Sequence, residues 1–437
     1  MVNEPSARYT AISRFIQVFL YWGSILALFL IVHLTTSRVD WIFRRWTRSS
    51  AFPLITANAD TIRAYAPICK TVLFVCAVAI LCLPILLDSY KALRSSKITD
   101  LVRGVFGAVL ISLLLYILVF RPSTDSMGTN YAIIAGNPFV QDSGIHNKRL
   151  LMPVLAYLFY LRDFQPYYIF SVVLTIAFIV LLSGWTNQHA QLSSWQMVSL
   201  CTCSFVLFQY QYGGYPDILV YVLFILVMQE YTHPTSKLSL LILALVAHEG
   251  SFLVGSILAW RYLDRKRLIF YLLAVTLYFF IWFWVSGQDI DIMLGGHRVE
   301  GLSGFAWLVS APFKEFIGVL VAYKAMWIIL FMSLWIAAKK GLFSDLIFIL
   351  ACVVAGIVMT ILGVDTSRLM GFAFPGFLVA LSLVSKQFDL TNSKRTLSFI
   401  FLLNLMLPSF NIGLNGGIEF FPGLYRVFYG WMAVMVQ

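Results

Sequence analysis

The sequence predicts an all-α polytopic membrane protein with about 13 transmembrane helices. Three observations support this fold class. Of the 437 residues, 60% are hydrophobic and only 12% are charged, which leaves too little polar surface for a soluble fold of this length. Apolar stretches recur along the whole chain, and basic residues separate them. The 37 Phe, 21 Tyr and 12 Trp residues suit aromatic belts at the two membrane interfaces.

Each span is placed by its length and hydropathy. A transmembrane helix needs about 20 apolar residues, or fewer where the helix is broken inside the protein. The final stretch, 420–437, is either interfacial or a fourteenth span. The other spans are expected near residues 15–36, 68–88, 105–120, 166–185, 197–211, 218–231, 238–247, 251–260, 268–287, 317–338, 342–364, 371–385 and 396–413.

These spans suggest three parts of the chain and no separate soluble domain. Residues 1–104 would form an extension with two spans and a cytoplasmic loop, and residues 105–385 a transmembrane core. Residues 386–437 would add a last span and an interfacial segment. The first apolar run lacks a small-residue cleavage site, so we interpret it as a retained span rather than a signal peptide.

The orientation follows from basic loops, which favour the cytoplasmic side. The strongest marker is the loop from Arg261 to Arg267, and Lys339-Lys340 agrees with it. One segment conflicts with this orientation. Because successive loops alternate between the two sides of the membrane, residues 37–67 should lie outside, yet they carry five arginines. The segment is either interfacial, or the first two spans are misplaced. The remaining outer segments would be 121–165, 212–217, 248–250, 288–316 and 365–370.

The assignment of loops to alternate sides of the membrane depends on a break at His248-Glu249-Gly250 between two half-spans. A single helix over 238–260 would bury the glutamate in the middle of the membrane and reverse every later loop. Irregular backbone at membrane depth is tolerated only where it lines a cavity enclosed by protein. The sequence therefore predicts such a cavity at this break.

The net charge and the cysteines narrow the possible partners. A charge of +11 can indicate nucleic acid, but these basic residues lie at the ends of apolar spans and so favour anchoring loops and contacts with anionic lipid or phosphate. Nearly all of the six cysteines lie inside apolar runs without zinc-type spacing, so we interpret them as packing residues.

Two candidate groups lie in the expected first outer loop. Asp125 follows the third span by about five residues, where it would be a general base or an electrostatic partner, or simply a helix cap. Lys148 and Arg149 precede a short apolar run with Pro153 in its first turns, which suits a helix lying on the outer face. These two cations would bind a lipid phosphate, or anchor the helix among headgroups.

Three more groups lie at later breaks, where ionisable residues are functional candidates by default. Asp217 follows a Gly-Gly and a Pro and either starts the next span or belongs to a site. His248 and Glu249 stand between the two half-spans, as ligand-binding residues or as a hydrogen-bonded pair that stabilises the break. Arg368 suits bidentate phosphate binding with Asp365 orienting it, unless the two form a structural ion pair.

No cofactor is expected. A divalent metal could use Asp125, Asp217 and the His248-Glu249 pair, but their spacing is not a zinc signature. The polar loop 288–316 would be a lid or the wall of an acceptor site, and nothing in it specifies a role.

The order of these features resembles the GT-C superfamily of integral-membrane glycosyltransferases, which use sugars linked to polyprenyl phosphate. Asp125 matches the early acidic residue of that family, and Lys148 to Pro153 matches its surface helix. Asp217, the pair His248-Glu249, and Arg368 before Pro375 match later features. The resemblance covers about residues 105–385. Asp125 stands without a second acid, His248 replaces the more usual lysine, and two spans precede the core.

The resemblance implies a sugar transferase on the outer face of a cytoplasmic membrane. Asp125 would activate the acceptor hydroxyl, and Arg368 with Lys148 or Arg149 would hold the phosphate. Asp217, His248, Glu249 and Asp365 would bind or orient substrate. The expected partners are a polyprenyl-phosphate-linked sugar, a glycolipid or glycan acceptor and membrane lipids, but no nucleic acid.

Three rival functions remain open on the sequence. A transporter or lipid flippase also uses broken helices and charges inside the membrane, but it should show two related halves, and no repeat is evident. A polysaccharide polymerase or ligase would share the lipid-phosphate chemistry. A non-catalytic scaffold would tolerate alanine at its polar positions.

Overall fold

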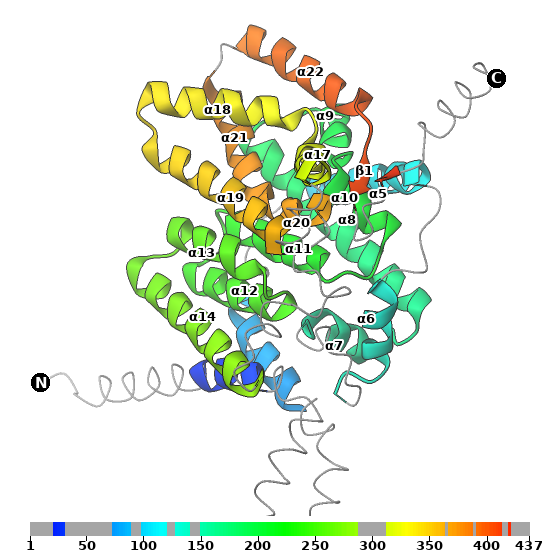
Figure 1. Cartoon of the computed structure of the whole chain (residues 1–437), viewed down its shortest axis with the longest axis vertical. Helices are drawn as coiled ribbons and strands as arrows, with labels where there is room; N and C mark the ends of the chain where they lie inside the picture. The colour runs from blue at the N-terminus through cyan, green and yellow to red at the C-terminus, as the bar shows by residue number, and fades with distance from the viewer. Residues whose placement is uncertain are drawn as a thin grey trace, which may run out of the picture.

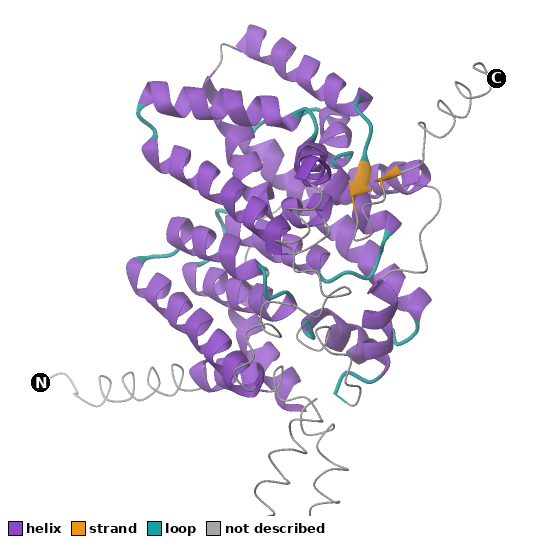
Figure 2. Cartoon of the chain, in the orientation of Figure 1, coloured by secondary structure: helices purple, strands orange, loops and turns teal. Residues whose placement is uncertain are grey.

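The computed structural model describes a helical protein. It describes residues 21–30, 72–88, 98–119, 127–139, 149–286, 312–362, 366–387, 390–412 and 418–420. Helices make up most of it, joined by short loops and turns, and there is one small antiparallel pair of strands (Figure 2). In this pair Phe410 lies opposite Phe420. The early helical segments are Tyr21–Leu30 and Val72–Asp88. The strands are β1 (Phe410–Ile412) and β2 (Ile418–Phe420).

The remaining helices follow in chain order and differ widely in length (Figure 1). Their bounds are α5 (Ile98–Val119), α6 (Met127–Gly136), α7 (Leu151–Leu158), α8 (Phe164–His189), α9 (Ser194–Cys201), α10 (Ser204–Gln211), α11 (Asp217–Met228), α12 (Pro234–Ala247), α13 (Ser251–Tyr262), α14 (Arg265–Ser286), α17 (Pro312–Tyr323), α18 (Met326–Lys340), α19 (Phe343–Leu362), α20 (Thr366–Met370), η2 (Gly371–Ala373), α21 (Phe374–Gln387) and α22 (Leu390–Met406).

Several of these helices are able to cross a membrane. Four described segments are long and apolar enough for this: α8, Arg265–Phe283, Phe343–Ile361 and Thr366–Lys386. The pair α17 and α18 would add a fifth span if the two helices, bent by 82° at their junction, cross together. The described chain is thus a helical protein with several membrane-spanning candidates, whereas the expected total of about 13 spans stays a prediction.

Apolar side chains on the outside of the bundle fit this assignment. Phe106, Phe280, Phe331 and Phe399 lie on four different helices and are each more than 60% exposed. In water such exposed faces would mark a docking or aggregation surface, whereas the apolar interior of a membrane would cover them without cost.

Two of the expected spans are each divided into two helices, and whether each stretch crosses the membrane stays a prediction. The stretch 197–211 forms α9 and α10, which separate at Thr202 and Cys203. The Thr202 hydroxyl donates to the Ser199 carbonyl at 2.7 Å and occupies a backbone acceptor at the end of α9. The stretch 317–338 breaks at Lys324, which has a φ of 50°.

Lys324 holds that break through its ammonium group. The group donates to Thr202 Oγ1, the Leu407 carbonyl and Ser409 Oγ at 3.0–3.2 Å. The buried ammonium thus finds an acceptor for each of its three N–H groups, and these acceptors lie beside α9 and after α22. Hydropathy does not reveal such a junction, because its partners are distant in sequence.

The break predicted at residues 248–250 is confirmed. Helix α12 ends at Ala247 and α13 begins at Ser251, while His248 has an extended backbone (φ −158°, ψ 121°). The Gly250 N–H donates to His248 Nδ1 at 3.0 Å, and the Ser251 N–H donates to the His248 carbonyl at 2.9 Å. These hydrogen bonds satisfy backbone groups that the broken helix leaves without partners.

Helix α11 lies in the interior of the bundle and packs against α8, α12 and α13 (Figure 1). Its residues are almost all buried, including the acidic residue Asp217 at its first position. The segment formed by α20 and η2 is also buried and packs against α10, α17 and α19. Two charged segments, far apart in sequence, therefore meet in the core of the helical bundle.

Candidate functional site

Asp217 and Arg368 form a buried ion pair between α11 and α20. Arg368 Nη1 donates to Asp217 Oδ2 at 2.6 Å, and the two residues are 151 positions apart in the chain. Asp217 is fully buried and Arg368 is only 6% exposed. A carboxylate in the first turn of a helix is also favoured by the helix dipole. Each charge therefore has the partner that a charge in a dry interior needs.

A second buried pair joins α7 to the break between α12 and α13. Arg149 stands two residues before α7, and its Nε donates to Glu249 Oε2 at 2.8 Å while its Nη2 donates to Oε1 at 2.6 Å. This is the bidentate geometry that a guanidinium offers to a carboxylate or a phosphate. Arg149 Nη1 also donates to the Tyr131 hydroxyl of α6 at 3.0 Å.

His248 connects the two pairs. Its Nε2 lies 3.4 Å from Asp217 Oδ1, and its Nδ1 lies 3.8 Å from Glu249 Oε2. Because Nδ1 accepts the Gly250 N–H, the proton of the neutral imidazole belongs on Nε2, which faces Asp217. We call Tyr131, Arg149, Asp217, His248, Glu249 and Arg368 the charge cluster.

Aromatic rings surround the guanidinium of Arg368. Its central carbon lies 4.7 Å from the Tyr215 ring centre and 5.8 Å from that of Phe208. The Tyr215 ring in turn approaches the Tyr131 ring, with centroids 6.3 Å apart. Such rings attract a cation and exclude water, and both effects strengthen electrostatic interactions at the charge cluster.

Two tyrosines fix the backbone that carries Arg368. The Tyr221 hydroxyl donates to the Arg368 carbonyl at 3.1 Å, and the Tyr323 hydroxyl lies 2.9 Å from the Gly371 carbonyl and 3.3 Å from that of Met370. Gly371 allows this close packing, because a Cβ there would lie 2.4 Å from the Tyr221 hydroxyl. The segment from 368 to 371 is therefore held by hydroxyl groups from α11 and α17.

The structure also shows a buried acid that sequence analysis left without a role. Glu315 on α17 is 4% exposed, and the Thr366 hydroxyl donates to its Oε2 at 2.5 Å. Thr366 lies two residues before Arg368 on the same short helix. The sequence placed Glu315 among seven charged or ionisable residues of one loop, so only packing against α20 distinguishes it.

Five of the eight sequence-predicted site residues meet in the charge cluster: Arg149, Asp217, His248, Glu249 and Arg368. The other three, Asp125, Lys148 and Asp365, lie outside the described residues. Tyr131 is an additional member, and its bond to Arg149 gave no signal in the sequence. Within the part of the chain that the structure describes, no group of three His, Cys, Asp or Glu residues has the arrangement of a metal site.

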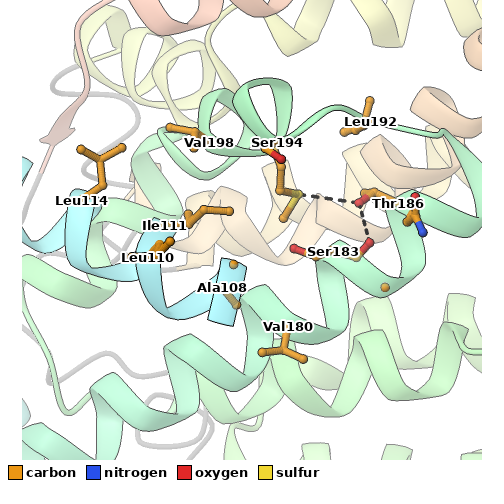
Figure 3. A pocket seen from close by; sticks show the side chains of 14 residues that line it. Ala108, Leu110, Ile111, Leu114, Val180, Ser183, Thr186, Leu192, Ser194 and Val198 are labelled. Carbon is orange, nitrogen blue, oxygen red and sulfur yellow. Dashed lines mark hydrogen bonds between the residues drawn. The ribbon is translucent and has the colours of Figure 1, made fainter. Parts of the chain in front are cut away.

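An apolar groove lies beside the C-terminal part of α8, away from the charge cluster. It has a volume of about 830 Å³ and runs between α5, α8 and α9, with Ile111, Val180 and Val198 among its lining residues (Figure 3). The charge cluster lies near the start of α8, where the Tyr167 ring lies beside Gly214, three residues before Asp217. From Tyr167 to Gly184 in the groove is 17 residues, or roughly 25 Å of helix.

Comparisons with protein-family models, with curated proteins and with solved structures find no match for this chain. The chemistry of the charge cluster must therefore follow from its own residues. Two guanidiniums, two carboxylates and one imidazole, buried together, can bind an anion, orient hydroxyl groups or move protons.

Proposed function

We propose that the protein is a glycosyltransferase that moves a sugar from a polyprenyl-phosphate donor to a lipid-linked or cell-envelope glycan acceptor. One observation supports this most directly: two arginines, Arg149 and Arg368, are buried with carboxylates and a histidine inside a bundle of apolar helices. A guanidinium held in place by a carboxylate is pre-organised for the phosphate of a substrate that enters from lipid.

Each residue of the cluster has a role in this proposal. Arg149 and Arg368 bind the phosphate and stabilise the charge that develops on it as the sugar leaves. Glu249 and Asp217 orient the two guanidiniums, and His248 holds the Asp217 carboxylate between its Nε2 and Arg368. Asp125, whose role rests on the sequence resemblance, takes the proton of the acceptor hydroxyl as that oxygen attacks the anomeric carbon.

The proposal includes a topology. About 13 spans cross the membrane, with a core at residues 105–385 and the cluster near the outer face of a cytoplasmic membrane. A prenyl tail that leaves the cluster along α8 reaches the apolar groove after roughly 25 Å. The groove is lined by α5, α8 and α9, and its lining atoms are mostly apolar, which suits a hydrocarbon chain.

The test is a transfer assay with the full chain in proteoliposomes. A panel of decaprenyl-phosphate-linked hexoses and pentoses, labelled in the sugar, serves as donors, and the release of decaprenyl phosphate is measured. Turnover is expected with at least one donor, and Asp125→Asn should lower it by about 10²–10⁴-fold while insertion and folding are retained. Retained turnover in that variant would remove Asp125 from the mechanism.

A transporter of lipid-linked sugars is the second candidate, because three helix pairs are broken inside the bundle: α9 and α10, α12 and α13, and α17 and α18. The same proteoliposomes distinguish the two functions. Counterflow of the labelled donor without cleavage of the sugar-phosphate bond would favour transport and overturn the transferase proposal.

A further inference from the structure

Beside the charge cluster lies a neutral polar group for which the described residues offer no hydrogen-bond partner. Tyr167 on α8 is fully buried, and its hydroxyl has no partner among the described residues. Its ring lies against the break that precedes Asp217: a Cβ added to Gly214 would lie 3.1 Å from Tyr167 Cε1 and 3.1 Å from Gly128 Cα. Gly128 is one helical turn before Tyr131 of the cluster, so Tyr167 lies where α6, α8 and this break meet.

A second such group lies on α10. Gln209 is fully buried, and neither its amide oxygen nor its amide nitrogen has a partner within the described chain. Its neighbour Phe208 packs on the Tyr215 ring, with centroids 5.2 Å apart, and faces the Arg368 guanidinium. Helix α10 packs against both α17 and α20, so Gln209 lies on the helix that forms the wall next to Arg368.

Burial without hydrogen bonds destabilises the folded protein. A phenol and a primary amide lose their bonds to water on burial, and phenylalanine or methionine would fill much the same space without this loss. Neither side chain is therefore explained by packing. A buried polar group without a partner calls for an explanation, and a ligand that supplies the partner is one.

We propose that Tyr167 and Gln209, beside the charge cluster, hydrogen-bond the hydroxyl groups of the sugar. This inference rests on the proposed function, in which Arg149 and Arg368 take the phosphate. A sugar hydroxyl is both donor and acceptor, as is the phenol, and the amide offers two donors and two acceptors. Neither group carries a charge, so both suit the uncharged ring rather than the phosphate.

The experiment compares two probes on the purified full chain in nanodiscs. One probe is decaprenyl phosphate, and the other is the decaprenyl-phosphate-linked sugar that binds best in the panel above. The wild type should prefer the sugar-bearing probe. Tyr167→Phe and Gln209→Met should each lower that preference about five- to tenfold, because each removes one or two neutral hydrogen bonds. Affinity for bare decaprenyl phosphate should not change, and the melting temperature should stay the same or rise.

Tyr168→Phe is the matched control. Its hydroxyl donates to the Tyr210 carbonyl at 2.8 Å, so the same substitution one residue later removes a bond that the fold uses. This variant should lower the melting temperature and keep the preference for the sugar-bearing probe. The contrast separates a ligand-facing hydroxyl from a structural one.

The outcomes distinguish this inference from the function on which it rests. If Tyr167→Phe and Gln209→Met keep the wild-type preference, or if the wild type binds both probes equally, the inference is wrong while phosphate binding stands. If the wild type binds neither probe, the proposed function is wrong, and the inference that rests on it is wrong as well. Gln209→Leu provides a second apolar variant if Gln209→Met fails to fold.

Discussion

Arg149 and Glu249 share two hydrogen bonds, Nε to Oε2 at 2.8 Å and Nη2 to Oε1 at 2.6 Å, across 100 residues of sequence. Both side chains are almost entirely buried. This ion pair ties the start of α7 to the break between α12 and α13, and through His248 it continues to Asp217 and Arg368. The geometry of the charge cluster therefore depends on ion pairs in which each buried charge is compensated by its partner.

The first prediction concerns this pair. Glu249→Gln should leave Arg149 buried with its charge uncompensated and lower the free energy of unfolding by about 3–5 kcal/mol. The double variant Arg149→Met with Glu249→Met should be more stable than Glu249→Gln, because no charge is left unpaired. Thermal unfolding of the detergent-solubilised variants measures both, and equal stability of single and double variants would contradict the prediction.

The second prediction concerns phosphate binding. Arg368→Lys keeps the positive charge but loses the planar fork, so affinity for decaprenyl phosphate should fall by about tenfold or more. Arg261→Lys is the control, since Arg261 also pairs with a carboxylate, Asp345, at a partly exposed site between α13 and α19. Binding measured in nanodiscs should be unchanged in that variant. A similar loss in both variants would indicate a general effect of arginine removal.

The third prediction concerns the backbone that carries Arg368. Tyr323→Phe removes the hydroxyl beside the Met370 and Gly371 carbonyls, which should cost about 1–3 kcal/mol of stability. Thr276→Val removes an exposed hydroxyl that donates to the Leu272 carbonyl of the same helix at 2.9 Å, and this variant should change stability little. Unfolding curves of the two variants test the difference, and equal effects would count against a special role for Tyr323.

The fourth prediction compares two glycines. In Gly371→Ala the new methyl group would lie 2.4 Å from the Tyr221 hydroxyl and 2.8 Å from Phe205 Cβ, so this variant should lose about 1–3 kcal/mol of stability. Nothing lies within 4 Å of a Cβ at Gly184, which is inside α8. Gly184→Ala should therefore be neutral or more stable by up to about 1 kcal/mol. Melting temperatures in the same detergent test this difference: the melting temperature should fall in Gly371→Ala and should stay the same or rise in Gly184→Ala.

The fifth prediction concerns topology. If Asp125 and Arg368 act on one substrate, both must face the same side of the membrane. Single cysteines are introduced at Ser126, next to Asp125, and at the exposed Lys314, whose neighbour Glu315 accepts a hydrogen bond from Thr366 two residues before Arg368. The two cysteines should share one pattern of labelling by a membrane-impermeant thiol reagent in intact cells and in inverted vesicles. The comparison requires a background without the native cysteines. Labelling from opposite sides would contradict the proposed mechanism.

Sequence patterns located much of the fold and most of the described site. Hydropathy placed spans near 166–185, 268–287 and 342–364, and the structure has α8, α14 and α19 there. The rule that ionisable residues are costly inside a membrane selected Asp217, His248, Glu249 and Arg368, which do meet. It also led to the break at 248–250, because a continuous helix would have buried a glutamate in lipid.

The structure alone decided the pairing within the site. Arg149 was expected on a helix at the membrane surface, and it lies buried against Glu249. Likewise, the breaks at Thr202 and Lys324 divide stretches whose hydropathy predicts continuous helices.

The sequence by itself determined that this chain is helical and apolar and that a few charges stand where helices break, because both follow from the cost of placing polar groups in hydrocarbon. Only the tertiary structure decided which charge meets which. An ion pair between residues 100 or 151 positions apart depends on how whole helices pack, and no local pattern of residues encodes that packing.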